Sequence, residues 1–297
     1  MISYFQAIVI GVLQGITELF PISSLGHSVL LPAWLGWDHI VSAQSADESF
    51  YLAFVVALHV ATALALLVYF RDEWVRIIAG FLRTLRTRRI ETPDERMAWL
   101  LVVATIPAGL TGLALEHALR TLFAKPLAAA IFLTLNGLVL LAGERLRRRA
   151  AVRNVVANHA TVHSDGGEEG RRLDTLDFKE AGLVGVAQIG ALFAGISRSG
   201  ITMVAGLVRG LDHEDAARFS FLLATPIILA AGIYKVPDLA GHLGDGIRGQ
   251  ALVGAIAAGV AASFSVRFLL RFFQTRNLLP FAIYCLAAGL ISIVRFA

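Results

Sequence analysis

Long apolar runs, separated by short polar segments, dominate this chain of 297 residues. Six of them are about 18 to 24 residues long, which is enough for a helix to cross a hydrocarbon core of roughly 30 Å. These runs lie at residues 50–70, 97–116, 126–145, 214–235, 250–272 and 278–296. The pattern predicts an all-α polytopic membrane protein with six full transmembrane spans.

Two further apolar regions, residues 4–37 and 180–210, are interrupted near their middle by Gly, Pro and hydroxyl-bearing residues. Each predicts two half-length helices and a polar turn, which suits a re-entrant hairpin better than a span. Non-helical backbone at membrane depth is tolerated only where protein or a wet cavity satisfies its polar groups.

The two interruptions share one plan. Residues 14–27 read QGITELFPISSLGH, and residues 188–202 read QIGALFAGISRSGIT. Aligned without a gap, they match in the pairs Gln14 and Gln188, Ser23 and Ser197, and Gly26 and Gly200. Paired broken helices at corresponding positions of two halves point to the active site of a membrane protein.

The distribution of basic residues predicts the orientation. Arginines gather in the connecting segments 71–96 and 146–178, which are expected in the cytoplasm, whereas 117–125 and 236–249 hold few and are expected outside, with both termini. Each half then has one hairpin and three spans, and this odd number of spans inverts the second half. We therefore expect one membrane domain: a first repeat at 1–145, a cytoplasmic linker at 146–178 and a second repeat at 179–297, with the hairpin tips meeting near the midplane.

Composition narrows the class of protein further. Hydrophobic residues make up 57% of the chain and charged residues 16%, which excludes an ordinary soluble domain. The net charge of +4 is interpreted as an orientation signal and a lipid-headgroup contact, not as a nucleic-acid surface. The single cysteine, Cys285, excludes an internal disulfide and a cysteine metal cluster. The N-terminus lacks the basic region of a cleavable signal peptide, so residue 1 is expected in the mature fold.

The first interruption carries a carboxylate and an imidazole. Gln14 and Glu18 are four residues apart and share a helix face. A carboxylate at membrane depth needs a partner or a role. A divalent cation held with substrate phosphate, Mg²⁺ with Ca²⁺ as the alternative, would supply one. A hydrogen bond from Glu18 to Thr17 or to a neighbouring helix is the other interpretation.

Pro21 is followed by two serines, a glycine and a histidine. Hydroxyls and free N–H groups at the start of a helix form an anion site, which assigns Ser23 and Gly26 to substrate binding. His27 suits phosphoryl acceptance or proton transfer, with Ser24 the less favoured nucleophile. A purely structural histidine is the alternative.

The second interruption places Arg198 where the first has Ser24. A guanidinium among hydroxyls suits bidentate phosphate binding, together with Ser197, Ser199 and Gly200. A structural ion pair with Glu18 is the alternative, and it would also bring the tips together. Thr202 either caps the next helix or contacts phosphate.

Three more polar residues interrupt apolar segments. His59, inside the span 50–70, is interpreted as structural in preference to lining a pocket. Arg218 and Ser220 open the span 214–235, and contact with headgroups is favoured over support of the site.

Taken together, the motifs resemble the undecaprenyl-diphosphate phosphatase family of the bacitracin-resistance type. That family carries E/Q-x-x-x-E, P-I-S-S-x-G-H and P-G-x-S-R-S-G-x-T, and the resemblance covers nearly the whole chain, including segments 218–224 and 281–284. Three positions depart from the family pattern. Gln14 stands where many members have Glu, Ala194 replaces the usual Pro, and Cys285 stands where an Arg is common.

The resemblance implies an enzyme of the bacterial inner membrane that hydrolyses a C55 polyprenyl diphosphate to the monophosphate carrier of cell-wall synthesis and confers bacitracin resistance. Its partners would be this lipid and the membrane, with a homodimer left open and the site open to the periplasmic side. The expected catalytic residues are Glu18, His27, Ser24 and Arg198. The expected substrate-binding residues are Ser23, Gly26, Ser197, Ser199, Gly200 and Thr202, and the metal ligands Glu18 and Gln14.

Phosphoryl transfer needs charge neutralisation and alignment, which this set can supply. Arg198 and the cation would hold the diphosphate, and Glu18 would bind the metal or orient His27. A transporter of a phosphorylated lipid is the alternative, because inverted repeats with broken helices are also typical of carriers. The other lipid phosphatase superfamily is a poor match, since Val204 stands where its motif requires His.

Overall fold

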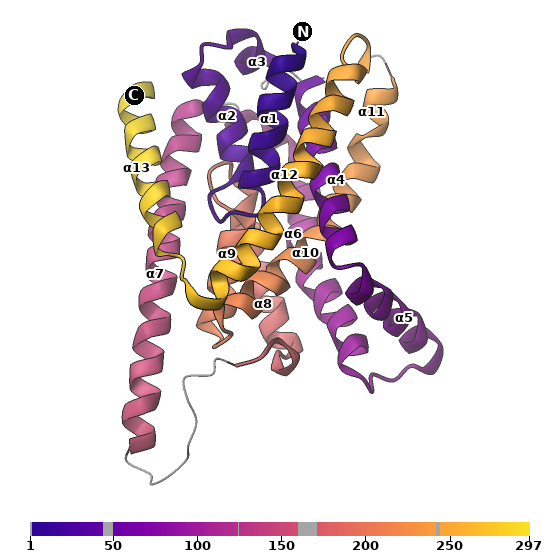
Figure 1. Cartoon of the computed structure of the whole chain (residues 1–297), viewed down its shortest axis with the longest axis vertical. Helices are drawn as coiled ribbons and strands as arrows, with labels where there is room; N and C mark the ends of the chain where they lie inside the picture. The colour runs from indigo at the N-terminus through magenta and orange to yellow at the C-terminus, as the bar shows by residue number, and fades with distance from the viewer. Residues whose placement is uncertain (1, 44–49, 124, 160–170, 242–243) are drawn as a thin grey trace.

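The computed structural model describes residues 2–43, 50–123, 125–159, 171–241 and 244–297. Apart from one bridge between Arg171 and Leu211, every regular element in these ranges is helical. The helices, shown in Figure 1, are α1 (Tyr4–Thr17), α2 (Ser24–Trp34), α3 (Asp38–Ala43), α4 (Phe50–Tyr69), α5 (Arg71–Thr87), α6 (Pro93–Phe123), α7 (Pro126–His159), α8 (Phe178–Gln188), α9 (Arg198–Val208), α10 (His213–Lys235), α11 (Pro237–Ala240), α12 (Arg248–Thr275) and α13 (Leu279–Phe296), with short 3₁₀ turns η1 (Leu173–Thr175) and η2 (Ile189–Leu192).

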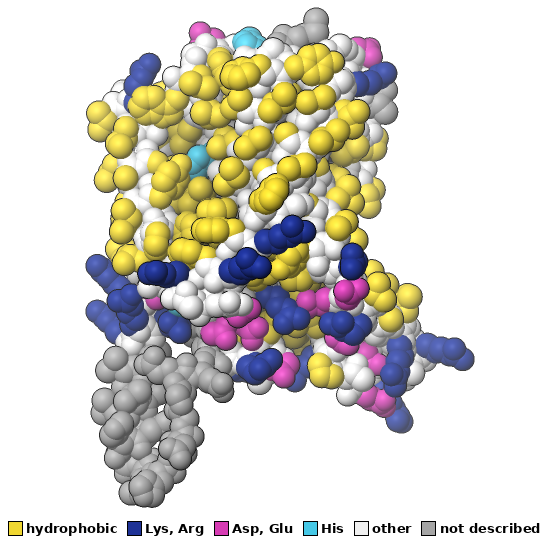
Figure 2. Space-filling model, in the orientation of Figure 1, with side chains coloured by type: hydrophobic (Ala, Val, Ile, Leu, Met, Phe, Trp, Pro, Cys, Tyr) yellow, Lys and Arg dark blue, Asp and Glu magenta, His cyan; other side chains and the backbone are white. Residues whose placement is uncertain are grey.

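Six of these helices are long and apolar enough to cross a membrane, so the predicted spans are confirmed. They are α4, α6, α7, α10, α12 and α13. Both termini lie at one end of the bundle (Figure 1). Lys and Arg side chains gather at the other end, below a broad hydrophobic belt (Figure 2). The chain is a multi-pass membrane protein.

The two remaining apolar regions form pairs of half-length helices, as expected. Residues 18–23 separate α1 from α2, and residues 189–197 separate α8 from α9. Each separation contains a residue with positive φ, Ser23 at 70° and Gly195 at 113°, so the chain cannot continue as a right-handed helix there.

The arginine-rich segment 71–96 is not the loop that was expected. It contains α5, a 17-residue helix with one apolar face. Ile77 on that face is buried, while the hydrophobic side chains Val75 and Ile78 stay exposed. The apolar residues of this segment recur at helical spacing, but many arginines stand between them. The prediction considered the charges and overlooked the apolar face. The expected linker at 146–178 is helical as far as His159, where α7 ends, and its residues 160–170 lie outside the described residues.

Each broken helix packs on a span from the other half of the chain. Helix α1 lies along α12, and α8 lies along α6. The close approach depends on corresponding glycines: a β-carbon on Gly11 would collide with the carbonyl oxygen of Gly254, and one on Gly185 with that of Ala104. Likewise α12 packs on α4, and α6 on α10. The pairs α1–α12 and α8–α6 thus correspond, as do the pairs α12–α4 and α6–α10.

Candidate active site

Matching serine caps begin the helix after each break. Ser23 caps α2, and its hydroxyl accepts a hydrogen bond from the backbone N–H of Gly26 at 3.2 Å. Ser197 caps α9 and accepts from the N–H of Gly200 at 3.1 Å. The gap-free alignment of the two motifs therefore corresponds to one capping hydrogen bond formed twice, with the positive end of a helix at each break.

The two breaks cross in direct contact. The N–H of Gly195 donates to the Ser23 hydroxyl at 3.1 Å, and a β-carbon on Gly26 would lie 2.8 Å from the α-carbon of Gly195. The Ser199 hydroxyl donates to the carbonyl of Phe20 at 3.2 Å. These contacts leave no room for a larger residue at Gly26.

A single buried amide on α7 ties the breaks together. Asn136 donates to the carbonyl of Pro21 at 2.9 Å, and its own oxygen accepts from the N–H of Ser197 at 2.9 Å. Asn136 is completely buried. Its two bonds satisfy one backbone group from each break, and nothing in the sequence pattern had singled it out.

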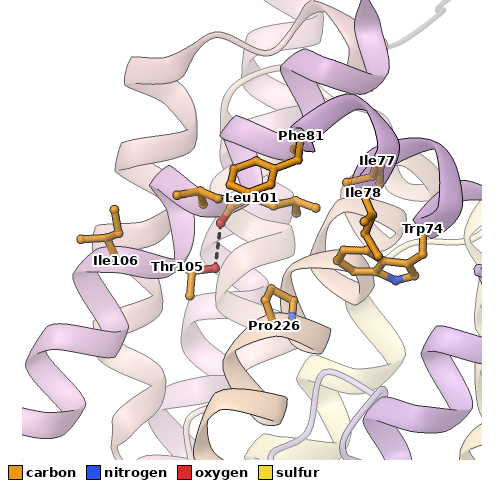
Figure 3. Close-up of a pocket in the computed structure, with 10 residues that line it drawn as sticks. Trp74, Ile77, Ile78, Phe81, Leu101, Thr105, Ile106 and Pro226 are labelled. Carbon is orange, nitrogen blue, oxygen red and sulfur yellow. Dashed lines mark hydrogen bonds between the residues drawn. The ribbon is translucent and has the colours of Figure 1, made fainter. Parts of the chain in front are cut away.

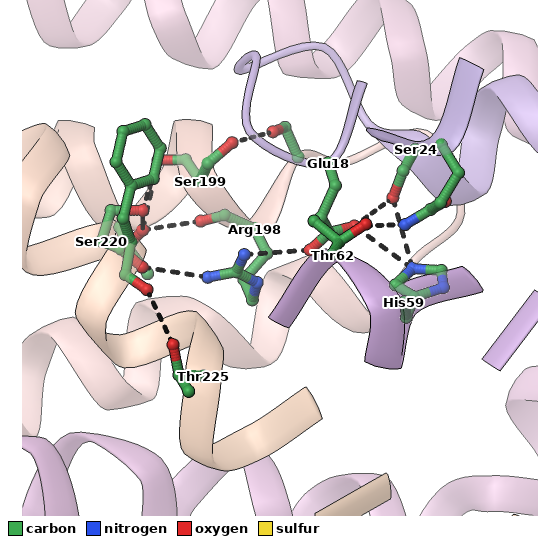
Figure 4. A network of polar contacts seen from close by, with 12 residues as sticks. Glu18, Ser24, His59, Thr62, Arg198, Ser199, Ser220 and Thr225 are labelled. Carbon is green, nitrogen blue, oxygen red and sulfur yellow. Dashed lines mark hydrogen bonds and ion pairs between the residues drawn. The ribbon is translucent and has the colours of Figure 1, made fainter. Parts of the chain in front are cut away.

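Glu18 and Arg198 form an ion pair across the crossing (Figure 4). Arg198 Nη2 lies 2.9 Å from Glu18 Oε1, and both side chains are largely buried. Arg198 Nη1 donates to the carbonyl of Ser220 at 3.1 Å. Ser220 is fully buried, so its expected contact with headgroups is wrong. Arg218, two residues earlier on α10, pairs with Glu73 on α5 at 3.0 Å.

The other carboxylate oxygen of Glu18 collects three polar neighbours. Ser24 Oγ donates to Glu18 Oε2 at 2.5 Å, Gln14 Nε2 donates at 3.2 Å, and His59 Nε2 lies 3.2 Å away. His59 Nε2 is also 3.4 Å from Ser24 Oγ (Figure 4). His59 thus belongs to the polar network, although the sequence favoured a structural role for it.

His27 lies in different surroundings. Its Nδ1 is 2.7 Å from the carbonyl of Ser23, and its Nε2 is 2.7 Å from the hydroxyl of Tyr284 on α13. The imidazole that Glu18 contacts is therefore that of His59, and the expectation that Glu18 orients His27 is wrong. Thr17 does not hold Glu18 either, since its hydroxyl donates to the carbonyl of Leu13 at 2.7 Å.

The remaining hydroxyls of the second break brace it internally. Ser197 Oγ and Ser199 Oγ are 3.0 Å apart. Thr202 donates to the carbonyl of Arg198 at 2.7 Å and lies 2.7 Å from the hydroxyl of Ser220. Thr202 lies inside α9, whose cap is Ser197, so the interpretation as a helix cap is wrong, and contact with phosphate stays a prediction.

The three departures from the family pattern all lie at or near the crossing. Ala194 is buried next to Gly195. Cys285 is fully buried, with its sulfur 3.3 Å from Asn136 Nδ2. Gln14 Oε1 is buried and has no hydrogen-bond partner among the described residues. Gln14 thus has a side-chain oxygen without a hydrogen bond, on a residue four positions before Glu18.

A divalent cation fits this donor set only in part. Glu18 and Gln14 offer one carboxylate and one amide oxygen, and the described residues contain no cluster of three or more His, Cys, Asp or Glu. Magnesium tolerates few protein ligands because it retains water and binds phosphate oxygens. The amide nitrogen of Gln14 faces Glu18 in this structure, so the unpartnered amide oxygen would bind such an ion together with Glu18 only after the amide rotates.

An apolar cavity of about 310 Å³ lies elsewhere, between α5, α6 and α10 (Figure 3). Trp74, Phe81, Leu101 and Pro226 line it. Thr105 also lines it, but its hydroxyl donates to the backbone carbonyl of Leu101 at 2.7 Å. No charged side chain lines this cavity. The charged side chains Glu18 and Arg198 lie instead at the crossing of the breaks.

Comparison with known proteins agrees with the motifs. The model of a family described as bacitracin resistance protein BacA matches residues 7–291. Undecaprenyl-diphosphatase 2 of Frankia alni is 58% identical over 338 residues, covering 100% of this chain and 98% of the relative. The undecaprenyl-diphosphatase of Mycolicibacterium paratuberculosis is 60% identical over 304 residues, with the same coverage. Undecaprenyl-diphosphatase 2 of Chromobacterium violaceum is 44% identical over 294 residues, covering 97% of each chain.

Proposed function

The chain belongs to the bacitracin resistance protein BacA family, and from this membership we propose that it is an undecaprenyl-diphosphatase. It removes the terminal phosphate of undecaprenyl diphosphate and leaves the monophosphate in the membrane. The observation that carries the proposal is the buried Glu18–Arg198 pair at the crossing of two capped helix starts. A guanidinium, two helix N-termini and several hydroxyls at one point suit a diphosphate.

Arg198 is the proposed diphosphate ligand. Its Nη1 is anchored on the Ser220 carbonyl, so the guanidinium plane is fixed while Nη2 exchanges Glu18 for a phosphate oxygen. The starts of α2 and α9 add backbone N–H groups that stabilise the charge of the transferring phosphoryl group. Ser23, Gly26, Ser197, Ser199, Gly200 and Thr202 hold these helix starts in place.

The geometry favours Ser24 over His27 as the attacking group. The Ser24 hydroxyl already donates to Glu18, which provides an acceptor for its proton, whereas Nε2 of His27 is held by Tyr284. Attack by Ser24 Oγ on the terminal phosphorus breaks the bond to the bridging oxygen, and undecaprenyl monophosphate departs. Water then releases phosphate from the serine.

Magnesium is the proposed cofactor, held by Glu18 and Gln14 with phosphate oxygens of the substrate. When bound, it neutralises diphosphate charge. Their shared helix face and the unpartnered oxygen of Gln14 support this proposal, which requires the Gln14 amide to rotate from its hydrogen bond with Glu18.

The two broken helices are proposed to be re-entrant hairpins of an inverted repeat. The exchanged contacts of α1 with α12 and of α8 with α6 support this arrangement. We place the arginine-rich end in the cytoplasm and the mouth of the site toward the outer side. Cysteines introduced as Asp174→Cys and Asp245→Cys, each with Cys285→Ser, would then react with an impermeant thiol reagent from opposite sides. Labelling from the same side would contradict the inverted arrangement.

Phosphate release in detergent tests the function. Purified protein should release phosphate from undecaprenyl diphosphate, should lose activity with a chelator and regain it with Mg²⁺. Ser24→Ala should fall to background, and His27→Ala should lose less if Ser24 attacks. A pure carrier of the lipid would release no phosphate, because transport needs two compartments.

A further inference from the structure

Tyr284 on α13 contacts His27 in a way that neither the motifs nor the relatives assign. The Tyr284 hydroxyl is 2.7 Å from His27 Nε2, and the two rings stack with centroids 5.7 Å apart and planes 13° from parallel. His27 is buried, while Tyr284 is 44% exposed on the outer surface of the bundle. The tyrosine therefore separates His27 from the lipid phase.

The hydrogen bonds define which nitrogen of His27 carries the proton. The Ser23 carbonyl, 2.7 Å from Nδ1, can only accept, so Nδ1 bears the hydrogen. In the neutral ring Nε2 then has a free lone pair, and the Tyr284 hydroxyl donates to it. The arrangement selects one tautomer and one ring orientation.

We propose that Tyr284 is a positioning residue for the phosphatase reaction: its hydroxyl donates to Nε2 and fixes the ring of His27, whose Nδ1–H tautomer is set by the Ser23 carbonyl. The inference rests on the proposed function for its kinetic consequence only. The hydrogen bond to Nε2 is a property of the protein without substrate and is measured independently of turnover.

The chain offers a matched control at the same helix interface. Trp34 on α2 donates to the hydroxyl of Ser292 on α13 at 3.1 Å. Trp34→Phe removes a hydrogen bond between the same two helices and leaves His27 untouched. A role limited to helix packing would make this variant and Tyr284→Phe equivalent.

The test combines nitrogen NMR with kinetics on detergent-purified, ¹⁵N-histidine-labelled protein. The His27 signals, assigned by their loss in His27→Gln, should report the Nδ1–H tautomer in wild type and in Trp34→Phe. Tyr284→Phe keeps the stacked ring and the Nδ1–H tautomer, but it removes the donor to Nε2, so the ¹⁵N signal of Nε2 should shift to that of a nitrogen without a hydrogen bond. Its kcat should fall about tenfold with KM nearly unchanged, and Trp34→Phe should keep kcat within twofold.

Each other result overturns the proposal. A wild-type Nε2–H tautomer contradicts the assigned hydrogen bonds, and an unchanged Nε2 signal in Tyr284→Phe removes the positioning role. Equal loss of kcat in both variants assigns Tyr284 to helix packing. If wild type releases no phosphate, the proposed function fails, whereas the Nε2 signal still decides the positioning.

Discussion

The two breaks end in the same serine cap but differ in backbone conformation and in charge. Both cap a helix with a serine that accepts from a glycine N–H three residues later. The first helix begins with Ser24 and follows a carboxylate, whereas the second begins with Arg198 and has Leu192 where the first has Glu18. The scaffold is duplicated while the chemistry is divided between the copies.

This division explains why the site lies at the crossing. A carboxylate in one half and a guanidinium in the other neutralise each other only where the breaks meet. Asn136 holds the breaks together there through one backbone group of each. Neither half alone contains an acid and a cation in its break. The proposed reaction therefore needs both copies, and substitutions can separate what each contributes.

The largest effect is expected for the charge that only the first break contains. Glu18→Ala should reduce phosphate release at least about 100-fold, a loss near 2.7 kcal/mol in transition-state stabilisation. Glu18→Gln should leave a trace of activity that added Mg²⁺ partly restores. Glu73→Gln is the matched control, since Glu73 pairs with Arg218 outside the network. More than a tenth of the wild-type rate in Glu18→Ala would refute the assigned role.

Replacing Arg198, the cation of the second break, with lysine should strongly reduce turnover. Arg198→Lys keeps the charge but loses the planar fork that bonds Ser220 and Glu18 together, so we expect a fall in kcat of roughly 30-fold or more. Arg218→Lys, at a cation outside the crossing, should stay near the wild-type rate. Near-normal turnover by Arg198→Lys would mean that only charge matters at this position.

The ion pair can be separated from substrate binding by thermal stability. Arg198→Ala should destabilise the protein by about 1–3 kcal/mol, because Glu18 loses one buried donor and keeps Ser24, Gln14 and His59. Adding Glu18→Gln should recover part of the melting temperature but none of the activity. Full activity in the double variant would make the pair purely structural.

Corresponding glycines should differ in their tolerance of a methyl group. A β-carbon at Gly26 would meet the backbone of Gly195 at 2.8 Å, whereas one at Gly200 would meet side-chain atoms of Leu140 and Pro21 at 3.1 and 3.3 Å. Gly26→Ala should therefore cost about 1–3 kcal/mol and Gly200→Ala less than ~1 kcal/mol. Melting curves in one detergent compare them directly, and equal losses would contradict the crossing geometry.

The smallest effect concerns the paired glutamines. Gln14→Glu places a second carboxylate beside Glu18, which should lower the melting temperature by a few degrees without divalent cations, and Mg²⁺ should restore it. Gln188→Glu has no acidic neighbour at Leu192, so Mg²⁺ should not rescue it. A Mg²⁺ response shared by both variants, or absent from both, would remove Gln14 from the metal site.

Run length and motif spacing predicted the spans and the two interruptions, because both depend on residues close in sequence. The gap-free match of Ser23 with Ser197 and of Gly26 with Gly200 predicted equivalent caps, which the structure contains. A direct Glu18–Arg198 pair was one of two alternatives, and spacing alone does not choose between partners 180 residues apart.

The residues that sequence reasoning misjudged lie on the spans that surround the breaks. His59 and Ser220 each stand alone in an apolar helix, and Asn136 belongs to no motif. Their roles come from tertiary packing of α4, α10 and α7 around the crossing, which no local pattern encodes. A polar residue within an apolar span is the sign that the sequence itself offers for them.

The order of synthesis gives the Glu18–Arg198 pair a consequence during biogenesis. The ribosome adds roughly 5–20 residues per second, so about 9–36 s separate the two residues in translation. Throughout that interval the nascent first half carries a carboxylate whose guanidinium partner does not yet exist. Messages truncated before codon 198 should therefore yield short-lived products, cleared by the quality-control proteases of the membrane while full-length chains persist.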